Sequence, residues 1–165
     1  MAALEAGLSA PDFTLNGMNG ERLSLAEARK KGPVVAAFFK ISCPICQYAF
    51  PFLERIFKAY PGSPVTLVGV SQNDKKETAA FAREYGITFP LLLDDTRAYP
   101  VSNGYGLTNV PTVFLISPGG KIEVSSAGWS KRDIEDLNAR VAQAAGTAPA
   151  QIFKPGEEVA EFKAG

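Results

Sequence analysis

One stretch of the chain decides its fold: Val34-Val35-Ala36-Ala37-Phe38-Phe39-Lys40-Ile41-Ser42-Cys43-Pro44-Ile45-Cys46. Its first six residues form a continuous apolar run with β-branched and aromatic members, which predicts a strand buried on both faces. Beyond the stretch, apolar residues recur at steps of four and three, as on one face of a helix: Cys46, Phe50, Leu53, Phe57 and Tyr60. A buried strand therefore passes into an amphipathic helix at two cysteines.

Cys43 and Cys46 are the only cysteines in the chain, and their positions assign them different roles. Cys46 shares the buried stripe of the predicted helix. Cys43 precedes that stripe and falls at the helix N-terminus, where unpaired N–H groups and the helix dipole stabilise an anion. Because cysteine reacts as a thiolate, and helix N-termini and Cys-X-X-Cys spacing favour that form, we predict redox chemistry. Cys43 is the expected accessible nucleophile, and Cys46 is the resolving thiol that closes a disulfide.

Length and composition indicate one compact globular domain. The chain has 165 residues, 46% of them hydrophobic, with 17 basic and 17 acidic side chains. We assign residues 1–146 to the domain and residues 147–165 to a tail rich in Ala, Pro, Gly and Glu, with partial ordering expected through Ile152 and Phe153. Zero net charge without a basic cluster argues against nucleic-acid partners. No apolar stretch approaches the roughly 20 residues needed to span a bilayer.

The first seven residues lack the basic and apolar regions of a secretory signal. We therefore expect a cytoplasmic protein, or an exported one if a leader has been trimmed from this end. Two cysteines cannot form the disulfide framework of a small secreted domain, and a core of this size does not need one.

Strand and helix patterns alternate along the rest of the chain. Two short extended pieces around a Gly/Asn turn at 16–20 predict an N-terminal hairpin. Further strands are expected at 34–39, 65–70, 90–93, 113–116 and 122–124, and helices at 24–29, 46–60, 74–85, before Gly104, and at 130–145. This order predicts an α/β sandwich in which helices flank a mixed central sheet, with an N-terminal β-hairpin in addition.

The ordered set of motifs resembles the thioredoxin fold. The similarity is strongest to the TlpA/ResA-type thiol–disulfide oxidoreductases of the redoxin superfamily, which also contains the alkyl hydroperoxide reductase/thiol-specific antioxidant group. It covers roughly residues 10–145 and rests on the cysteine pair, Pro51 five residues after it, and three further segments: 7–13, 85–90 and 110–121. The resemblance implies a thioredoxin-like sandwich that exchanges its dithiol or disulfide with partner disulfides or thiols.

The resemblance also implies roles for residues outside the cysteine pair. Pro111 would be a cis proline lying against the two cysteines, and the backbone of Val110 would receive the extended chain of a partner. We assign Pro44 and Ile45 to the same partner-binding surface. The expected partners are thiols and disulfides of proteins or small molecules, with electrons supplied by another thiol. No metal, nucleotide or flavin cofactor is required, and we expect a monomer.

Three positions depart from the family pattern. A buried acid six residues before the first cysteine of thioredoxin is Ala37 here, and a glutamate common six residues after it in TlpA/ResA-type proteins is Ala49. Position 42, often tryptophan, is Ser42. Lys40 is the nearest candidate charge that would favour the Cys43 thiolate if it faces the site; otherwise it is a solvated charge at a strand end.

Two alternative functions are disfavoured by the residues present. A peroxiredoxin-like thiol peroxidase would need a proline and a hydroxyl residue before its cysteine and a later arginine to polarise peroxide, but these positions hold Ala36, Lys40 and Pro111. A thioredoxin-fold module that binds partners without turnover is disfavoured because both cysteines are retained.

A structural zinc site needs four Cys or His ligands, and this chain has two cysteines and no histidine.

Overall fold

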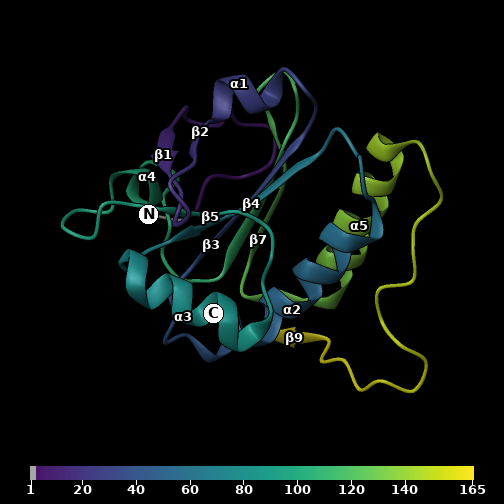
Figure 1. The fold of residues 1–165 in the computed structure, drawn as a ribbon. Coiled ribbons are helices and arrows are strands. Elements are labelled where there is room, and N and C mark those ends of the chain that lie inside the picture. Colours follow the sequence, from purple (N-terminus) through teal and green to yellow (C-terminus); the bar gives the residue numbers. More distant parts are fainter. Residues whose placement is uncertain (1–2) are drawn as a thin grey trace.

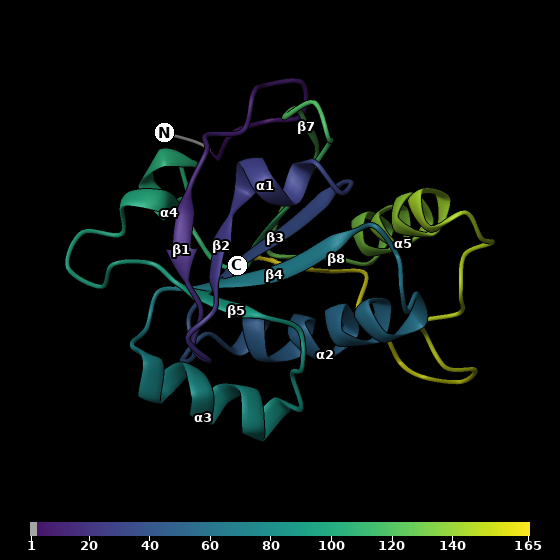
Figure 2. The same ribbon diagram turned by 45° about the horizontal axis from the view of Figure 1, so that its top comes forward.

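The computed structural model describes residues 3–165 and centres on a mixed five-stranded sheet (Figures 1 and 2). Met1 and Ala2, the start of the segment searched for a secretory signal, lie outside the described residues. The strands follow the order β5, β4, β3, β6, β7, with bounds Leu91–Leu93, Thr66–Ser71, Val34–Phe39, Thr112–Ile116 and Ile122–Ala127. The first three strands in that order are parallel, and β6 and β7 run antiparallel to their neighbours.

Two layers cover the sheet. One face carries α1 and α4 with the N-terminal hairpin, and the other carries α2, α3 and α5 (Figure 2). The hairpin strands β1 and β2 are Thr14–Asn16 and Arg22–Ser24, and the helices α1 to α5 are Leu25–Arg29, Pro44–Ala59, Lys75–Tyr85, Pro100–Gly104 and Lys131–Ala145. The predicted thioredoxin-like sandwich with an N-terminal hairpin is confirmed.

The central strand β3 divides its side chains between two cores. Alternate residues of a strand point to opposite faces, and every residue of β3 is fully buried, as its continuous apolar run predicts. Val35, Ala37 and Phe39 pack with α2, α3 and α5, whereas Val34, Ala36 and Phe38 pack with α1 and the hairpin side. Because it is held from both faces, β3 is a rigid base for the residues that follow it.

The helix ends agree with the sequence signals. Ser24, Asp74 and Ser130 each cap a helix by accepting a backbone N–H three residues later. Gly86 and Gly146 end α3 and α5 in the left-handed conformation, which glycine adopts without steric cost. No helix within residues 3–165 is long and apolar enough to cross a membrane.

The apolar stripe of α2 is buried as predicted except at Phe57. Cys46, Phe50 and Leu53 are completely buried, but 38% of Phe57 is exposed. Phe57 lies near the end of α2, where its ring meets Phe89 edge-on with centroids 6.0 Å apart and borders an apolar pocket. Helical periodicity placed Phe57 on the correct face, but the neighbouring side chains leave this pocket open and do not cover the ring.

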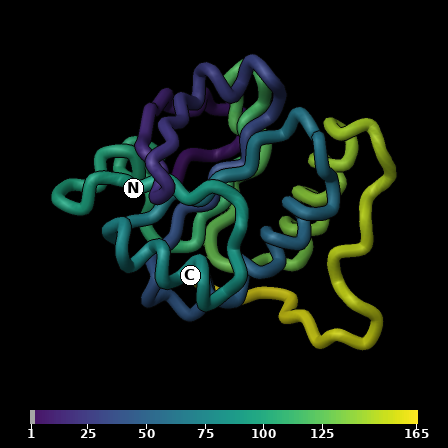
Figure 3. The backbone as a smooth tube through the Cα atoms, viewed as in Figure 1, coloured from purple at the N-terminus to yellow at the C-terminus, as the bar shows by residue number. Residues whose placement is uncertain are grey.

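The C-terminal segment 147–165 lies along the molecule. It leaves the end of α5, runs outside the helices and returns to the cysteine end of α2 (Figure 3). Ile152 is buried and Phe153 packs on Phe52 with ring centroids 5.4 Å apart, in agreement with the ordering expected there. The segment then forms β9 (Phe162–Lys163), which pairs antiparallel with β8 (Trp129–Ser130). Neither short strand was predicted.

Candidate active site

The reactive cysteine sits where β3 passes into α2. Cys43 is the N-cap residue of α2, and its Sγ accepts the backbone N–H of Cys46 at 3.1 Å. A capping sulfur therefore occupies the place of the usual capping oxygen, at the helix end where partial positive charge gathers. Cys43 is half-buried, so its sulfur can be reached from solvent. This is the placement that the sequence predicts for a nucleophilic thiol.

Cys46 lies beneath Cys43 in the core. It is fully buried, and both cysteines are free thiols in this structure. Burial raises the pKa of the Cys46 thiol far above its usual range, and hydrogen bonding with the Cys43 side chain raises it further. Cys46 is therefore protonated at neutral pH, and Cys43 is the more accessible of the two residues.

A loop from the far end of the chain completes the site. The Val110–Pro111 peptide bond is cis, as the resemblance implies, and the Val110 carbonyl oxygen accepts a hydrogen bond from the Cys43 thiol at 3.5 Å. Thr112 Oγ1 donates to the Asn109 carbonyl at 2.9 Å, and the Gly128 N–H donates to the Pro111 carbonyl at 2.7 Å. These two bonds hold the loop itself in place, and the bond from Cys43 joins it to the start of α2. The Val110 N–H has no acceptor within residues 3–165.

Two polar side chains that received no role in the sequence analysis hold the loop before the cysteines. Asn73 Oδ1 accepts the Ile41 N–H at 3.0 Å, and Gln47 Nε2 donates to the Ile41 carbonyl at 2.9 Å. Asn73 follows β4 at the carboxyl edge of the parallel strands, where α/β sheets place functional groups. This position after β4 is the one sequence feature that could have predicted the role of Asn73. An ordinary helix-capping residue would occupy the same position, so the sequence alone does not separate the two roles.

The other predicted site residues lie around the cysteines. Pro44 is exposed at the first turn of α2, and Ile45 is half-buried. Lys40 is exposed and lines a polar pocket of about 200 Å³ together with Val110 and Gln72. Its carbonyl accepts the Cys43 N–H at 3.3 Å. The structure thus brings every predicted residue to one end of the sheet, while their roles toward a partner stay predictions.

No carboxylate replaces the two acids missing from the family pattern. Ala37 and Ala49 are buried, and among residues 3–165 no acidic side chain contributes to the raised pKa of Cys46. The buried acid of α2 is Glu54, which accepts the N–H groups of Thr88 at 2.8 Å and Phe89 at 3.3 Å. Glu54 therefore holds the loop before β5 and is not a proton relay to Cys46.

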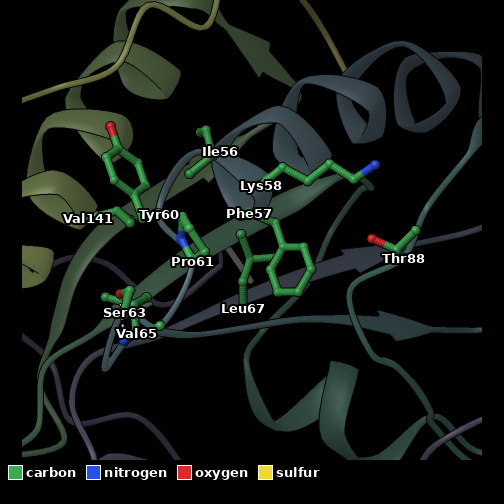
Figure 4. A pocket seen from close by; sticks show the side chains of 11 residues that line it. Ile56, Phe57, Lys58, Tyr60, Pro61, Ser63, Val65, Leu67, Thr88 and Val141 are labelled. Atoms are coloured by element: carbon green, nitrogen blue, oxygen red, sulfur yellow. Dashed lines mark hydrogen bonds between the residues drawn. The ribbon is translucent and has the colours of Figure 1, made fainter.

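A second hollow lies at the opposite end of α2. This apolar pocket has a volume of about 370 Å³ and is lined by the last turns of α2, the following loop, the start of β4, and Val141 of α5. Figure 4 shows Phe57 beside Leu67, with the Lys58 amine directed away from them. It contains no cysteine and no residue predicted for the site.

Comparison with known proteins identifies the family. Residues 6–125 match the model of the AhpC/TSA family. The thiol–disulfide oxidoreductase ResA of Geobacillus thermodenitrificans is 33% identical over 81% of this chain and 76% of its own length, and that of Geobacillus kaustophilus is 31% identical over the same shares. A crystal structure of a putative thiol:disulfide interchange protein DsbE from Chlorobium tepidum superposes with a TM-score of 0.75 at 26% identity, covering 87% of this chain and all of that one. The chain belongs to the AhpC/TSA family, and within it to the ResA-type thiol–disulfide oxidoreductases.

Proposed function

We propose that this oxidoreductase acts by dithiol–disulfide exchange in which Cys43 attacks and Cys46 resolves. In the reducing direction, the Cys43 thiolate attacks one sulfur of a partner disulfide. A Cys43–partner disulfide forms, the partner's sulfur–sulfur bond breaks, and the second partner sulfur leaves as a thiolate that takes a proton. The N-terminal N–H groups of α2, including that of Cys46, stabilise the negative charge on Cys43 before the attack.

Cys46 completes the reaction. It loses its proton and attacks the Cys43 sulfur, the Cys43–Cys46 disulfide forms, and the first partner sulfur leaves as a thiolate. Two electrons pass from the protein dithiol to the partner disulfide. Because burial disfavours the Cys46 thiolate and no acidic side chain within residues 3–165 acts on it, we assign its proton to the partner thiolate that is released in the first step. Reversal of these steps oxidises a partner dithiol.

Partner binding is proposed at the surface around Cys43. The Val110 N–H is free within the described residues and its carbonyl meets the reactive sulfur, so an extended partner chain can pair there as an added strand. Pro44 and Ile45 border the reactive sulfur on the α2 side. Pro111 holds Val110 in place through its carbonyl, which accepts the Gly128 N–H.

The observation that carries this proposal is the Cys43 sulfur, which caps α2 and contacts Val110 at the same time. The test is reduction of insulin disulfides by the reduced protein, with consumption of hydrogen peroxide measured in parallel. We expect insulin reduction coupled to formation of one Cys43–Cys46 disulfide per reaction. Rapid peroxide consumption without insulin reduction would instead establish a peroxidase.

A further inference from the structure

The last residues of the sequence reach the loop that contacts the proposed reactive cysteine. A Cβ atom built on Gly165 would lie 2.7 Å from the Val110 carbonyl oxygen and 2.5 Å from Asn109 Nδ2, so the backbone of Gly165 is packed against this loop. The same Val110 oxygen accepts the hydrogen bond from Cys43 Sγ. Gly165 and the nucleophilic sulfur therefore flank one carbonyl group.

Specific contacts hold the segment that leads to Gly165. The Ala160 N–H donates to the Tyr48 hydroxyl at 3.1 Å, and Trp129 Nε1 donates to the Ala160 carbonyl at 2.6 Å. Pairing of β9 with β8 follows directly, and Lys163 Nζ lies over the Tyr48 ring, 5.1 Å from its centroid. Tyr48 stands two residues after Cys46, so the segment is anchored to the same helix that presents both cysteines.

Gly128 shows how closely the segment approaches the cis-proline loop. A Cβ atom at position 128 would lie 2.5 Å from the Lys163 carbonyl oxygen and 2.8 Å from the Gly165 nitrogen, so no side chain fits there while the segment is docked. Gly128 also donates its N–H to the Pro111 carbonyl. One residue thus contacts both the terminal segment and the loop that presents Val110.

We propose that residues 162–165 are a specificity-determining segment that covers the Val110 side of the site and selects partners by size. This inference rests on the proposed function, in which a protein partner pairs with Val110. An added strand lies about 4.8 Å from its neighbour, and Gly165 already fills space beside the Val110 carbonyl. A small disulfide reaches Cys43 with the segment docked, whereas an extended protein chain must first displace it.

The first test loosens the segment by Lys163→Pro in the full chain. Lys163 faces Trp129 in the β8–β9 register, and proline has no N–H for strand pairing. In this variant an incoming protein chain no longer spends binding free energy on displacing residues 162–165. We therefore expect kcat/KM for insulin to rise about tenfold, while that for oxidised glutathione changes less than about twofold. An insulin-to-glutathione ratio equal to or below that of the wild type overturns the inference.

Glu158→Pro is the matched control. Glu158 is an exposed residue that precedes residues 162–165 and makes no hydrogen bond within residues 3–165, so the same substitution there leaves the ratio unchanged. An equal rise in the control would assign the effect to proline in general and overturn the role of residues 162–165. If the wild type reduces neither substrate, the proposed function itself fails, which is a separate result.

A second measurement needs no substitution in the segment. The Cys46→Ser protein is held as a mixed disulfide on Cys43, either with glutathione or with an unfolded single-cysteine protein, and amide hydrogen exchange is followed in residues 160–165. We expect these amides to exchange faster in the protein adduct than in the glutathione adduct. Equal exchange in the two adducts overturns the inference, whereas failure to form either adduct counts against the proposed function instead.

Discussion

The two ends of α2 have very different surroundings. At its C-terminal end is the apolar pocket of about 370 Å³, bordered by Phe57 and Leu67. Near its N-terminal end, Val110 and Lys40 line a polar pocket of about 200 Å³ to which α2 itself contributes no residue. The helix is 16 residues long, so about 24 Å separate its ends. The larger and more apolar hollow is lined by no cysteine, and the smaller one is lined by Val110, whose carbonyl accepts the hydrogen bond from Cys43.

We therefore place the proposed chemistry at the N-terminal end of α2 and not in the larger cavity. The N-terminal end presents free N–H groups and positive partial charge, which stabilise a thiolate, whereas the C-terminal end presents carbonyl groups, which do not. A thiol–disulfide reaction also needs little enclosed volume, because the partner brings its own disulfide on an extended chain. We expect substitutions at the N-terminal end of α2 to change reactivity and substitutions at its C-terminal end to change stability.

The largest expected effect is at the N-terminal end. Cys43→Ser should abolish reduction of insulin, because the serine hydroxyl does not ionise at neutral pH and cannot form a mixed disulfide. Turnover is measured with dithiothreitol as the electron donor, and circular dichroism checks the fold. Activity equal to that of the wild type would remove Cys43 from the mechanism and end the contrast between the two helix ends.

Cys46→Ser should separate the two chemical steps. Cys43 can still attack, but nothing inside the protein can resolve the product, so a covalent Cys43–partner adduct accumulates. Non-reducing electrophoresis and mass spectrometry detect the adduct, and dithiothreitol releases it. The matched control is Cys43→Ser, in which Cys46 is the one remaining thiol and for which we expect no adduct. An adduct carried by Cys46 in that variant would contradict the assignment.

At the opposite end we expect loss of stability without loss of chemistry. Ile56 is fully buried and borders the apolar pocket, so Ile56→Ala should lower the free energy of unfolding by about 2–5 kcal/mol. Insulin reduction per folded molecule should not change. Urea denaturation gives the first quantity, and Phe57→Ala, at a partly exposed position, should cost less. A large fall in kcat for the Ile56 variant would show that the two ends are coupled.

The smallest effect is expected where the C-terminal segment crosses α2. Arg55 donates two hydrogen bonds to the Glu157 carboxylate, at 2.7 and 2.9 Å, and mainly for this reason the pKa of Glu157 is lowered to about 2 from an ordinary value of 4.5. A lowered pKa contributes stability that is present above pH 4.5 and is lost as pH falls toward 2. We expect docking of the segment to weaken over that window.

Fluorescence of Trp129 measures this docking, because Trp129 is the only tryptophan and contacts Phe153 and Ala160 of the segment. Glu157→Gln is the control and should remove the part of the fluorescence change between pH 4.5 and 2 that this carboxylate causes. Identical titrations of the two proteins would show that the Arg55–Glu157 contact does not hold the segment.

Much of the fold was predictable because it is encoded by short-range periodicity. Each of three signals depends only on residues that are close together in the sequence: the apolar run of β3, the apolar stripe of α2, and the capping residues Asp74 and Ser130. The structure contains all three features. Phe57 shows the limit of such patterns. Periodicity predicts which face of the helix a residue occupies, but only the packed molecule shows whether neighbouring side chains cover that residue.

The amino-acid sequence alone determined the local setting from which we predict the reacting atom: a cysteine at the start of a helix, a second cysteine one turn later, and a buried strand before them. The tertiary structure decided what surrounds that atom. Val110 meets Cys43 from 67 positions away, and Gly165 arrives from farther still. No repeating pattern encodes such pairings, because they depend on how loops without periodicity settle once the sheet and helices have packed.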